Sequence, residues 1–338
     1  MRRLPIFLVL DVSESMAGAP LEELKKGVQT LSKTLTNDPM ALETAYLSII
    51  VFAGKAKVLT PLTSILDFIP PTLSIGAGTN LSSALECLMK EIDSKVKKNT
   101  PTAKGDWKPL VFILTDGTPN DNYLPAVNRW KAQYGKYTVL AVLMGEHSDA
   151  TALKTLTDNV IVFKEATPES FSSFFRWVSS SVQTSSKELG VQGKTSIEDT
   201  KQLRINFDAD LLAETIPTKN KIEYFVLPVR CQSTKKPYIM RYVKKAGSSL
   251  YVLDGACPVD EGYFELTGIE ESNKRISEEM LDGQVAPCPY CENTMLGRSG
   301  CGKWLCLNPS KLNRVKCPWC NQIEAFGGGV GSLNGGLG

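Results

Sequence analysis

The chain has 338 residues, which is enough for about two domains with a sizeable hydrophobic core. Its hydrophobic fraction of 42% is typical of folded globular proteins, and a net charge of +2 indicates no overall preference for nucleic acid or a membrane surface. No segment approaches the roughly 20 apolar residues that span a bilayer, so we expect no membrane association. Nine cysteines, six of them within residues 288–320, indicate metal ligation in a reducing compartment more than disulfides.

The first predicted element is a buried strand at residues 6–10, where the apolar run IFLVL precedes Asp11. An uninterrupted apolar run is typical of a parallel strand that is buried on both faces. Asp11, Ser13 and Ser15 follow and offer a row of oxygen ligands. Because ligands collect at the carboxyl edge of open α/β sheets, this loop is a candidate site for Mg²⁺, which prefers oxygen donors.

Strand-like and helix-like segments alternate over roughly the first half of the chain. This alternation predicts an α/β fold with a doubly wound, mostly parallel sheet and helices on both faces. Pro61 in the predicted strand at residues 56–63 indicates that this strand lies at an edge of the sheet. The later predicted strands lie at residues 45–54, 56–63, 110–115, 137–143 and 160–163, and the predicted helices lie at 20–35, 81–96, 150–157 and 171–178, with one more that extends through residue 130.

Two later segments bring further oxygen ligands to the same predicted edge. Thr79 lies in a Gly-rich loop before a predicted helix, and Asp116 follows the strand at 110–115. Hydroxyl groups and only two carboxylates leave a divalent cation incompletely neutralised, which favours an added acidic ligand. Two alternatives are a helix-capping turn without metal and an enzyme that activates water or polarises a phosphate. These motifs contain neither Lys nor His to act as the base, which argues against the enzyme.

The composition changes after the first predicted domain, at 1–183. Residues 184–200 are rich in Ser and Thr, which predicts a linker and leaves phosphorylation open. Short aromatic and β-branched runs then predict a small β-rich domain at 201–324. Residues 325–338 are rich in glycine and cannot form a core, so we expect a flexible tail.

The cysteines of the second domain form the other strong signal. Two C-x-x-C turns can present four thiolates to one tetrahedral Zn²⁺ ion and stabilise a zinc-ribbon-like fold. Basic residues and two tryptophans nearby leave nucleic-acid binding open as an alternative, but their charge excess is small. The number of zinc ions, one or two, also stays open. The candidate ligands are Cys288, Cys291, Cys301, Cys306, Cys317 and Cys320, and Cys231 and Cys257 would complete a second set of four.

Asp11, Ser13, Ser15, Thr79 and Asp116 together resemble the metal-ion-dependent adhesion site of von Willebrand factor A domains, whose pattern is D-x-S-x-S, then T, then D. The resemblance implies a Rossmann-like domain in which the first four side chains hold Mg²⁺. Asp116 then makes an orienting contact, often through water. An acidic residue of a protein partner completes the coordination.

The order of the parts is similar to that of the TerY family, which are von Willebrand A proteins associated with bacterial tellurite resistance and stress systems. The segments RRLPIFLVLDVSESM, DPMALETAYLSIIVF and KGDWKPLVFILTDGTPND carry this resemblance together with the C-terminal cysteine module. It implies a cytoplasmic, non-enzymatic adaptor with a metal-binding C-terminal domain. The partners it implies are a Ser/Thr protein kinase and a PP2C-type phosphatase. The alternatives are a metal-dependent hydrolase or phosphotransfer enzyme and a zinc ribbon that binds nucleic acid.

Overall fold

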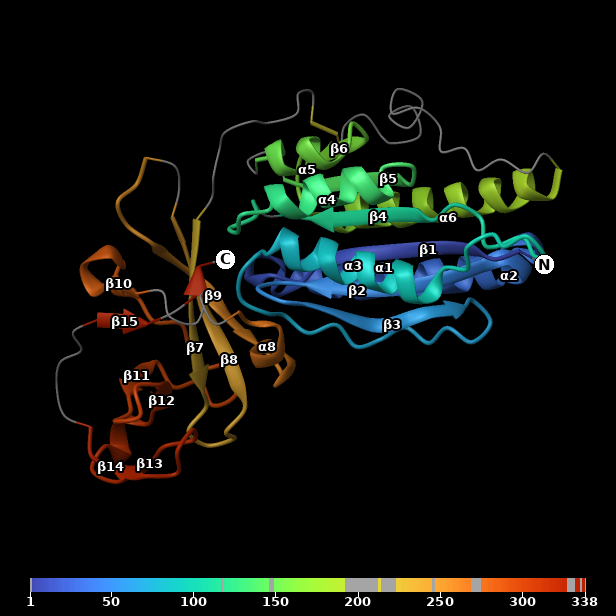
Figure 1. The fold of residues 1–338 in the computed structure, drawn as a ribbon. Helices are drawn as coiled ribbons and strands as arrows, with labels where there is room; N and C mark the ends of the chain where they lie inside the picture. The colour runs from blue at the N-terminus through green and yellow to red at the C-terminus, as the bar shows by residue number, and fades with distance from the viewer. Residues whose placement is uncertain are drawn as a thin grey trace.

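The structure, a computed structural model, has an N-terminal α/β domain and a C-terminal β-rich domain, as the sequence predicts (Figure 1). Residues 192–200 of the predicted linker lie outside the described residues. The structure describes residues 2–116, 118–145, 149–191, 212–213, 223–244, 247–268, 275–326, 332–334 and 336–337.

A six-stranded sheet in the order β3-β2-β1-β4-β5-β6 forms the middle of the N-terminal domain. β1 lies between β2 and β4 and pairs parallel with both, whereas β3 pairs antiparallel at the edge. Every residue of β1 and β4 is buried, which explains their continuous apolar sequences. The strands are β1 (Leu4–Asp11), β2 (Ala45–Phe52), β3 (Ala56–Ser64), β4 (Leu110–Thr115), β5 (Thr138–Met144) and β6 (Val160–Phe163).

Helices cover both faces of this sheet, so alternate residues of β1 enter two different cores. Ile6 and Leu8 belong to the core with α1 and α6, and Phe7 and Val9 belong to the core with α3 and α4. The short helix α2 was not predicted, because six residues are too few to show a helical repeat. The helices are α1 (Ala19–Thr36), α2 (Pro39–Thr44), α3 (Leu81–Lys95), α4 (Leu124–Tyr134), α5 (Thr151–Leu156) and α6 (Pro168–Val191), with the 3-10 turn η1 (Glu14–Met16) after β1.

The C-terminal domain contains a second sheet, in the order β11-β12-β7-β8-β9, with β16 beside β7. β7, β8 and β9 form an antiparallel meander, and β12 joins β7 in parallel. The elements are β7 (Glu223–Arg230), β8 (Pro237–Lys244), β9 (Val252–Pro258), α8 (Gly262–Leu266), β10 (Arg275–Ser277), η4 (Glu278–Met280), β11 (Met295–Arg298), β12 (Trp304–Leu307), η5 (Pro309–Lys311), β13 (Val315–Lys316), β14 (Ile323–Glu324), β15 (Ser332–Asn334) and β16 (Gly336–Leu337).

Two segments differ from the sequence predictions. α6 continues to Val191, so residues 184–191 of the predicted linker are helical. Within the predicted flexible tail, β15 pairs with β10 and β16 pairs with β7. Composition misses both, because Ser and Thr are tolerated in a helix and because glycine-rich strands gain their hydrogen bonds from partners far away in the sequence.

The C-terminal domain stands at the end of the first sheet where the parallel strands finish (Figure 1). Val226, Ile239 and Tyr263 of this domain belong to the same buried cluster as Leu8 of β1. Backbone contacts cross the boundary too, since Lys55 N donates to the Leu266 carbonyl at 2.8 Å. The two domains therefore share a core at the sheet edge where the sequence predicts the oxygen-ligand site.

Candidate metal centres

The loop after β1 turns three oxygen-bearing side chains toward one another. Asp11 ends β1 and is fully buried, and its Oδ1 accepts a hydrogen bond from Ser13 N at 2.8 Å. The 3-10 turn η1 then brings Ser15 back, so that the Ser13 and Ser15 hydroxyl oxygens lie 3.0 Å apart. One side of a cation's coordination shell can therefore come from this loop alone.

Asp116 reaches the same loop because β1 and β4 are adjacent parallel strands that end side by side. The Ser15 hydroxyl donates to Asp116 Oδ1 at 2.7 Å, and the Thr115 hydroxyl donates to Asp11 Oδ2. Adjacent oxygen ligands of an octahedral Mg²⁺ ion, bound at 2.0–2.1 Å, lie about 2.9 Å apart. The Ser13–Ser15 and Ser15–Asp116 oxygen separations, 3.0 and 2.7 Å, are hydrogen-bond distances that are compatible with this value. The hydroxyl and carboxylate oxygens are also the donor types that Mg²⁺ prefers, so the residues present fit the ion.

Thr79 lies near the loop after β1 because the preceding residue, Gly78, contacts that loop. The Gly78 N–H donates to Glu14 Oε2 at 2.9 Å, and Glu14 lies inside the D-x-S-x-S segment. Thr79 is buried, and Asn120 fixes its backbone by accepting from Thr79 N at 3.4 Å and donating to the Thr79 carbonyl at 3.0 Å. The structure therefore places Thr79 next to the loop, and the role of its hydroxyl as a metal ligand stays a prediction.

The carboxyl groups of Asp11 and Asp116 both have raised pKa values. Burial raises the pKa of Asp11 to about 6. Burial raises the pKa of Asp116 to about 7, and the negative charge of Asp11 adds to this shift. Two neighbouring carboxyl groups with raised pKa values favour a cation between them, because the cation offsets the cost of both negative charges.

The C-terminal domain forms one wall of this site. Arg241 of β8 donates from Nη1 to the carbonyl oxygens of Glu14, Ser15 and Ala17, at 3.0, 3.2 and 3.2 Å, and its Nε pairs with Asp254. The positive charge of Arg241 also lowers the pKa of Asp116. Sequence reasoning missed Arg241 because a single arginine inside a strand belongs to no motif.

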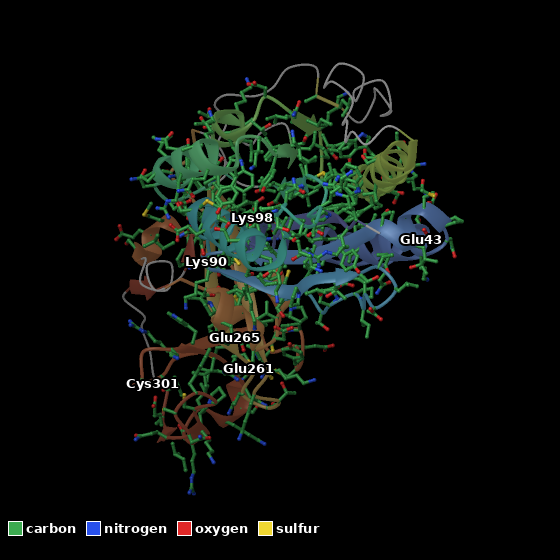
Figure 2. The ribbon with its side chains drawn as sticks, turned by 45° about the vertical axis from the view of Figure 1, so that its right-hand side comes forward. Glu43, Lys90, Lys98, Glu261, Glu265 and Cys301 are labelled. Carbon is green, nitrogen blue, oxygen red and sulfur yellow. The ribbon has the colours of Figure 1, made fainter. Side chains whose placement is uncertain are left out.

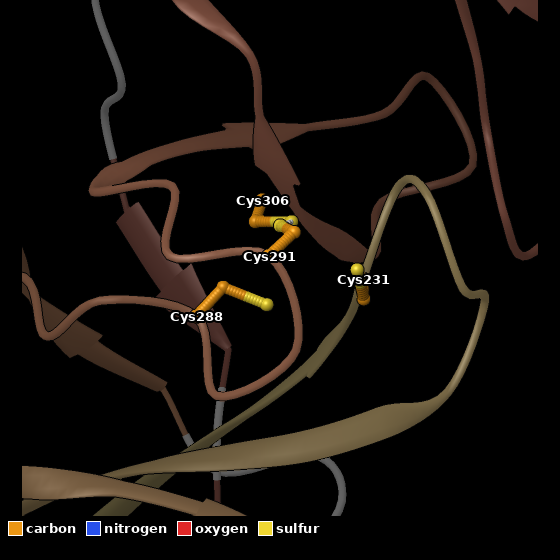
Figure 3. Close-up of side chains that lie close together, drawn as sticks. All are labelled: Cys231, Cys288, Cys291 and Cys306. Carbon is orange, nitrogen blue, oxygen red and sulfur yellow. Dashed lines mark hydrogen bonds between the residues drawn. The ribbon is translucent and has the colours of Figure 1, made fainter.

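Four cysteines gather between β7 and β12 (Figure 3). Their sulfur atoms all lie within 4.8 Å of one another, and the Sγ atoms of Cys291 and Cys306 are 3.5 Å apart. Sulfur atoms around a tetrahedral Zn²⁺ ion with 2.3 Å bonds lie about 3.8 Å apart. All four thiols are free, so the cluster fits a closed, four-coordinate zinc site. Its members are Cys231, Cys288, Cys291 and Cys306.

A second cluster contains three cysteines, Cys301, Cys317 and Cys320, with the Sγ atoms of Cys301 and Cys317 3.9 Å apart. Cys301 and Cys320 are exposed, and Cys301 lies in the part of the C-terminal domain remote from the first sheet (Figure 2). The Ser299 hydroxyl lies 3.9 Å from Cys320 Sγ and donates to Glu324 at 2.8 Å. Three thiolates can bind zinc with the fourth position taken by another group.

Turns of one kind present most of these thiols. In each turn the N–H of the fourth residue after a cysteine donates to that cysteine's carbonyl, and this fourth residue has a positive φ near 62° to 64°. In the turn that starts at Cys231, Thr234 occupies the place of the second cysteine, so the C-x-x-C signal is missing there. The turns begin at Cys231, Cys288 and Cys317 and have Lys235, Glu292 and Asn321 as their fourth residues.

Backbone N–H groups also point at the sulfur atoms. Thr234 N donates to Cys231 Sγ at 3.4 Å, and Gln232 N donates to Cys306 Sγ at 3.3 Å. Burial raises the pKa of the Cys231 thiol, but the hydrogen bonds from Thr234 and its neighbours outweigh burial, so the pKa falls to about 7. A lowered pKa favours the thiolate, which is the form that binds metal.

These clusters correct one expectation. The two C-x-x-C pairs do not lie in a single cluster, because Cys288 and Cys291 belong to the first cluster and Cys317 and Cys320 belong to the second. Cys257, the suggested eighth ligand, belongs to neither cluster and packs against the core of the first domain. Spacing could not reveal this, since the pairing depends on how β12 and the turns fold back on β7.

Within the described part of the chain, no helix is both long enough and apolar enough to cross a membrane. No curated protein matches the chain. Among solved structures, proximal thread matrix protein 1 from the mussel byssus is 18% identical with a TM-score of 0.39, covering 52% of this chain and 47% of its own. This chain therefore spans about half the length of that protein. The protein BatB from Bacteroides thetaiotaomicron is 17% identical with a TM-score of 0.37, covering 52% of this chain and 98% of its own.

Two family models match the chain, and together they account for both domains. The von Willebrand factor type A domain matches residues 6–177, and the TerY-C metal binding domain matches residues 222–336. The order of these two domains confirms the resemblance that the sequence motifs carry. The chain therefore belongs to the von Willebrand factor type A family and has a TerY-like architecture, with a TerY-C metal binding domain after the first domain.

Proposed function

We propose that the protein is a non-enzymatic adaptor that binds a protein partner through Mg²⁺ held by Asp11, Ser13, Ser15, Thr79 and Asp116. The observation that carries this proposal is the 2.7 Å hydrogen bond from Ser15 to Asp116, which joins residues 101 positions apart beside the buried carboxyl group of Asp11. Hydroxyl ligands leave the ion with residual positive charge. A Glu or Asp side chain of the partner then completes the coordination.

Binding is favoured over catalysis by the groups around Asp116. Among the described residues, the charges that shift its pKa are those of Asp11 and Arg241. A guanidinium group stays protonated and cannot accept a proton from water, so Arg241 cannot serve as a general base. The charges of Asp11 and Arg241 beside Asp116 therefore support a charged docking site better than a hydrolase or a phosphotransfer enzyme.

The cysteine clusters have a structural role in this proposal. We assign Zn²⁺ to both of them, with four thiolates in the first cluster and three in the second. Free thiols in quantity favour a reducing compartment, and we propose the cytoplasm. The TerY-like architecture favours a stress-response or tellurite-resistance system, in which a Ser/Thr kinase or a PP2C-type phosphatase is the candidate partner.

Calorimetric titration of the full-length, zinc-loaded protein with Mg²⁺ tests the cation site. We expect saturable binding that Asp116→Asn abolishes and that Asp67→Asn, a change at an exposed carboxylate, leaves intact. A purified candidate kinase is then tested on immobilised protein with Mg²⁺ and with chelator. Binding that persists in chelator, or that survives Asp116→Asn, would contradict the metal-dependent adaptor.

A further inference from the structure

We propose that Tyr263 of the C-terminal domain is a positioning residue for the cation site, so that docking of the C-terminal domain and binding of Mg²⁺ favour one another. This coupling rests on the proposed cation site. It concerns a residue that is no ligand and that lies outside the von Willebrand factor type A domain.

The coupling depends on the buried carboxylate of Glu14, which contacts both Tyr263 and the loop before Thr79. Its Oε2 accepts from Gly78 N at 2.9 Å, and its Oε1 accepts from the Tyr263 hydroxyl at 3.1 Å. Glu14 has 0% and Tyr263 has 1% exposure, so water does not replace either bond. A buried carboxylate is stable only when its oxygens have donors, and here one donor comes from each side.

Glu14 and Gly78 are sequence neighbours of the proposed metal ligands, so their contact affects the metal site. Glu14 lies between the ligands Ser13 and Ser15, and Gly78 immediately precedes Thr79. The carboxylate therefore fixes the spacing between the two loops that carry these ligands, and the Tyr263 hydroxyl holds the carboxylate in place. A backbone bond from Gly76 N to the Val12 carbonyl at 2.9 Å also joins the two loops, so loss of the Tyr263 hydroxyl loosens their spacing and does not separate them. Mg²⁺ is sensitive to such a change, because this ion demands near-ideal octahedral geometry.

The C-terminal domain also contacts each loop separately. Arg241 binds three carbonyl oxygens of the loop after β1, and Thr267 Oγ1 accepts from Ala77 N at 3.1 Å in the loop before Thr79. An exposed ion pair between Lys57 of β3 and Glu265 of α8 also joins the two domains. The docked C-terminal domain therefore contacts both ligand-bearing loops at once. A domain that only lay beside the site would not hold the two loops in this way.

Thermodynamic linkage makes the effect reciprocal, because docking that raises the affinity for Mg²⁺ requires Mg²⁺ to strengthen docking by the same factor. Two backbone amides report docking directly. Lys55 N donates to the Leu266 carbonyl at 2.8 Å, and Ala77 N donates to Thr267 Oγ1. Their hydrogen exchange becomes faster when the C-terminal domain moves away.

The test is calorimetric Mg²⁺ binding to full-length, zinc-loaded Tyr263→Phe. The matched control is Tyr290→Phe, which removes a phenol hydroxyl that donates to the Pro237 carbonyl at 2.9 Å within the C-terminal domain. We expect about a tenfold loss of Mg²⁺ affinity for Tyr263→Phe, the typical effect of removing one donor from a buried charged group. We expect no change for Tyr290→Phe, and normal zinc content in both variants.

The second arm keeps Tyr263 intact. In the wild-type protein, Mg²⁺ should slow hydrogen exchange at Lys55 and Ala77, and Thr267→Ala should weaken Mg²⁺ binding. If the wild-type protein binds Mg²⁺ while Tyr263→Phe and Thr267→Ala bind it equally well, the coupling is wrong and the proposed function stands. If the wild-type protein does not bind Mg²⁺, both are wrong.

Discussion

The oxygen-ligand site and the cysteine clusters reach their geometry by opposite routes. The first site lies on the rim of a sheet whose central strands, β1 and β4, are buried along their whole length, and its ligands come from loops about 100 residues apart. The clusters are presented by short local turns. The four-cysteine cluster lies in a core of 12 buried residues that includes Cys231, Cys288 and Cys306, and a further separate core of the C-terminal domain consists of Leu305, Leu307 and Val315. A large core can hold ligands in place without metal, whereas a small core depends on its metal.

The largest effect is therefore expected at the four-cysteine cluster. Cys306→Ser should release zinc and unfold the C-terminal domain, because structural zinc contributes about 10 kcal/mol or more to the folding of small domains. Thermal unfolding followed by circular dichroism, together with zinc analysis, measures this. Cys257→Ser, at a cysteine outside both clusters, is the control and should keep full zinc content. Normal unfolding of Cys306→Ser would contradict the assignment.

The three-cysteine cluster should matter less. Cys320→Ser leaves two thiolates at an exposed site, so we expect loss of the second zinc while the four-cysteine cluster keeps its ion. The expected destabilisation is smaller than for Cys306→Ser, since the turn at Cys317 has few buried neighbours. Zinc analysis by mass spectrometry under native conditions distinguishes loss of one ion from loss of both, and loss of both would show that the clusters are not independent.

Removing a carboxylate at the oxygen-ligand site should affect binding and not folding. Asp116→Asn should lower the affinity for Mg²⁺ at least a hundredfold. In chelator at neutral pH it should raise the free energy of unfolding by about 1–2 kcal/mol, because it removes a carboxyl group whose pKa is raised in the native state. Urea denaturation in chelator measures this change. A large destabilisation would mean that the rim of the sheet, like the cysteine clusters, depends on its ligands for folding.

The smallest effect concerns pH. The pKa values of Asp11 and Asp116, about 6 and about 7, exceed the ordinary value of 3.8, so the metal-free native state binds more protons than the unfolded state over this range. Its free energy of unfolding therefore falls as pH rises from about 4 to about 7 through these groups. Mg²⁺ binds the ionised carboxylates, so its stabilisation should be greater at pH 8 than at pH 5. Equal stabilisation at both values in thermal unfolding would contradict this.

Much of the N-terminal domain is predictable from its sequence because its signals are local. The run at residues 6–10 identifies a buried strand. Asp11 and Asp116 come at the ends of two such runs, and the structure shows that these two strands are adjacent. The wall formed by Arg241 is not predictable in this way, because docking of one domain on another depends on surfaces that no periodicity describes.

The cysteine clusters also depend on contacts between distant segments that the sequence does not predict. The C-x-x-C spacing identifies two turns, but it cannot say which turns share an ion, since that depends on where β12 places Cys306 beside the turn at Cys231. The turn at Cys231 has no second cysteine, so only its backbone geometry relates it to the others. The individual cysteine turns were thus predictable from the sequence, whereas the grouping of distant cysteines into clusters was not.

The most direct test of the central claim is a crystal structure of the full-length protein grown with Mn²⁺ in place of Mg²⁺, with anomalous scattering used to locate the ion. Our account predicts one manganese bound by the hydroxyl oxygens of Ser13 and Ser15, with Asp11 and Asp116 beside it and the C-terminal domain docked as described. A manganese ion bound elsewhere, with no anomalous signal between Ser15 and Asp116, would contradict it.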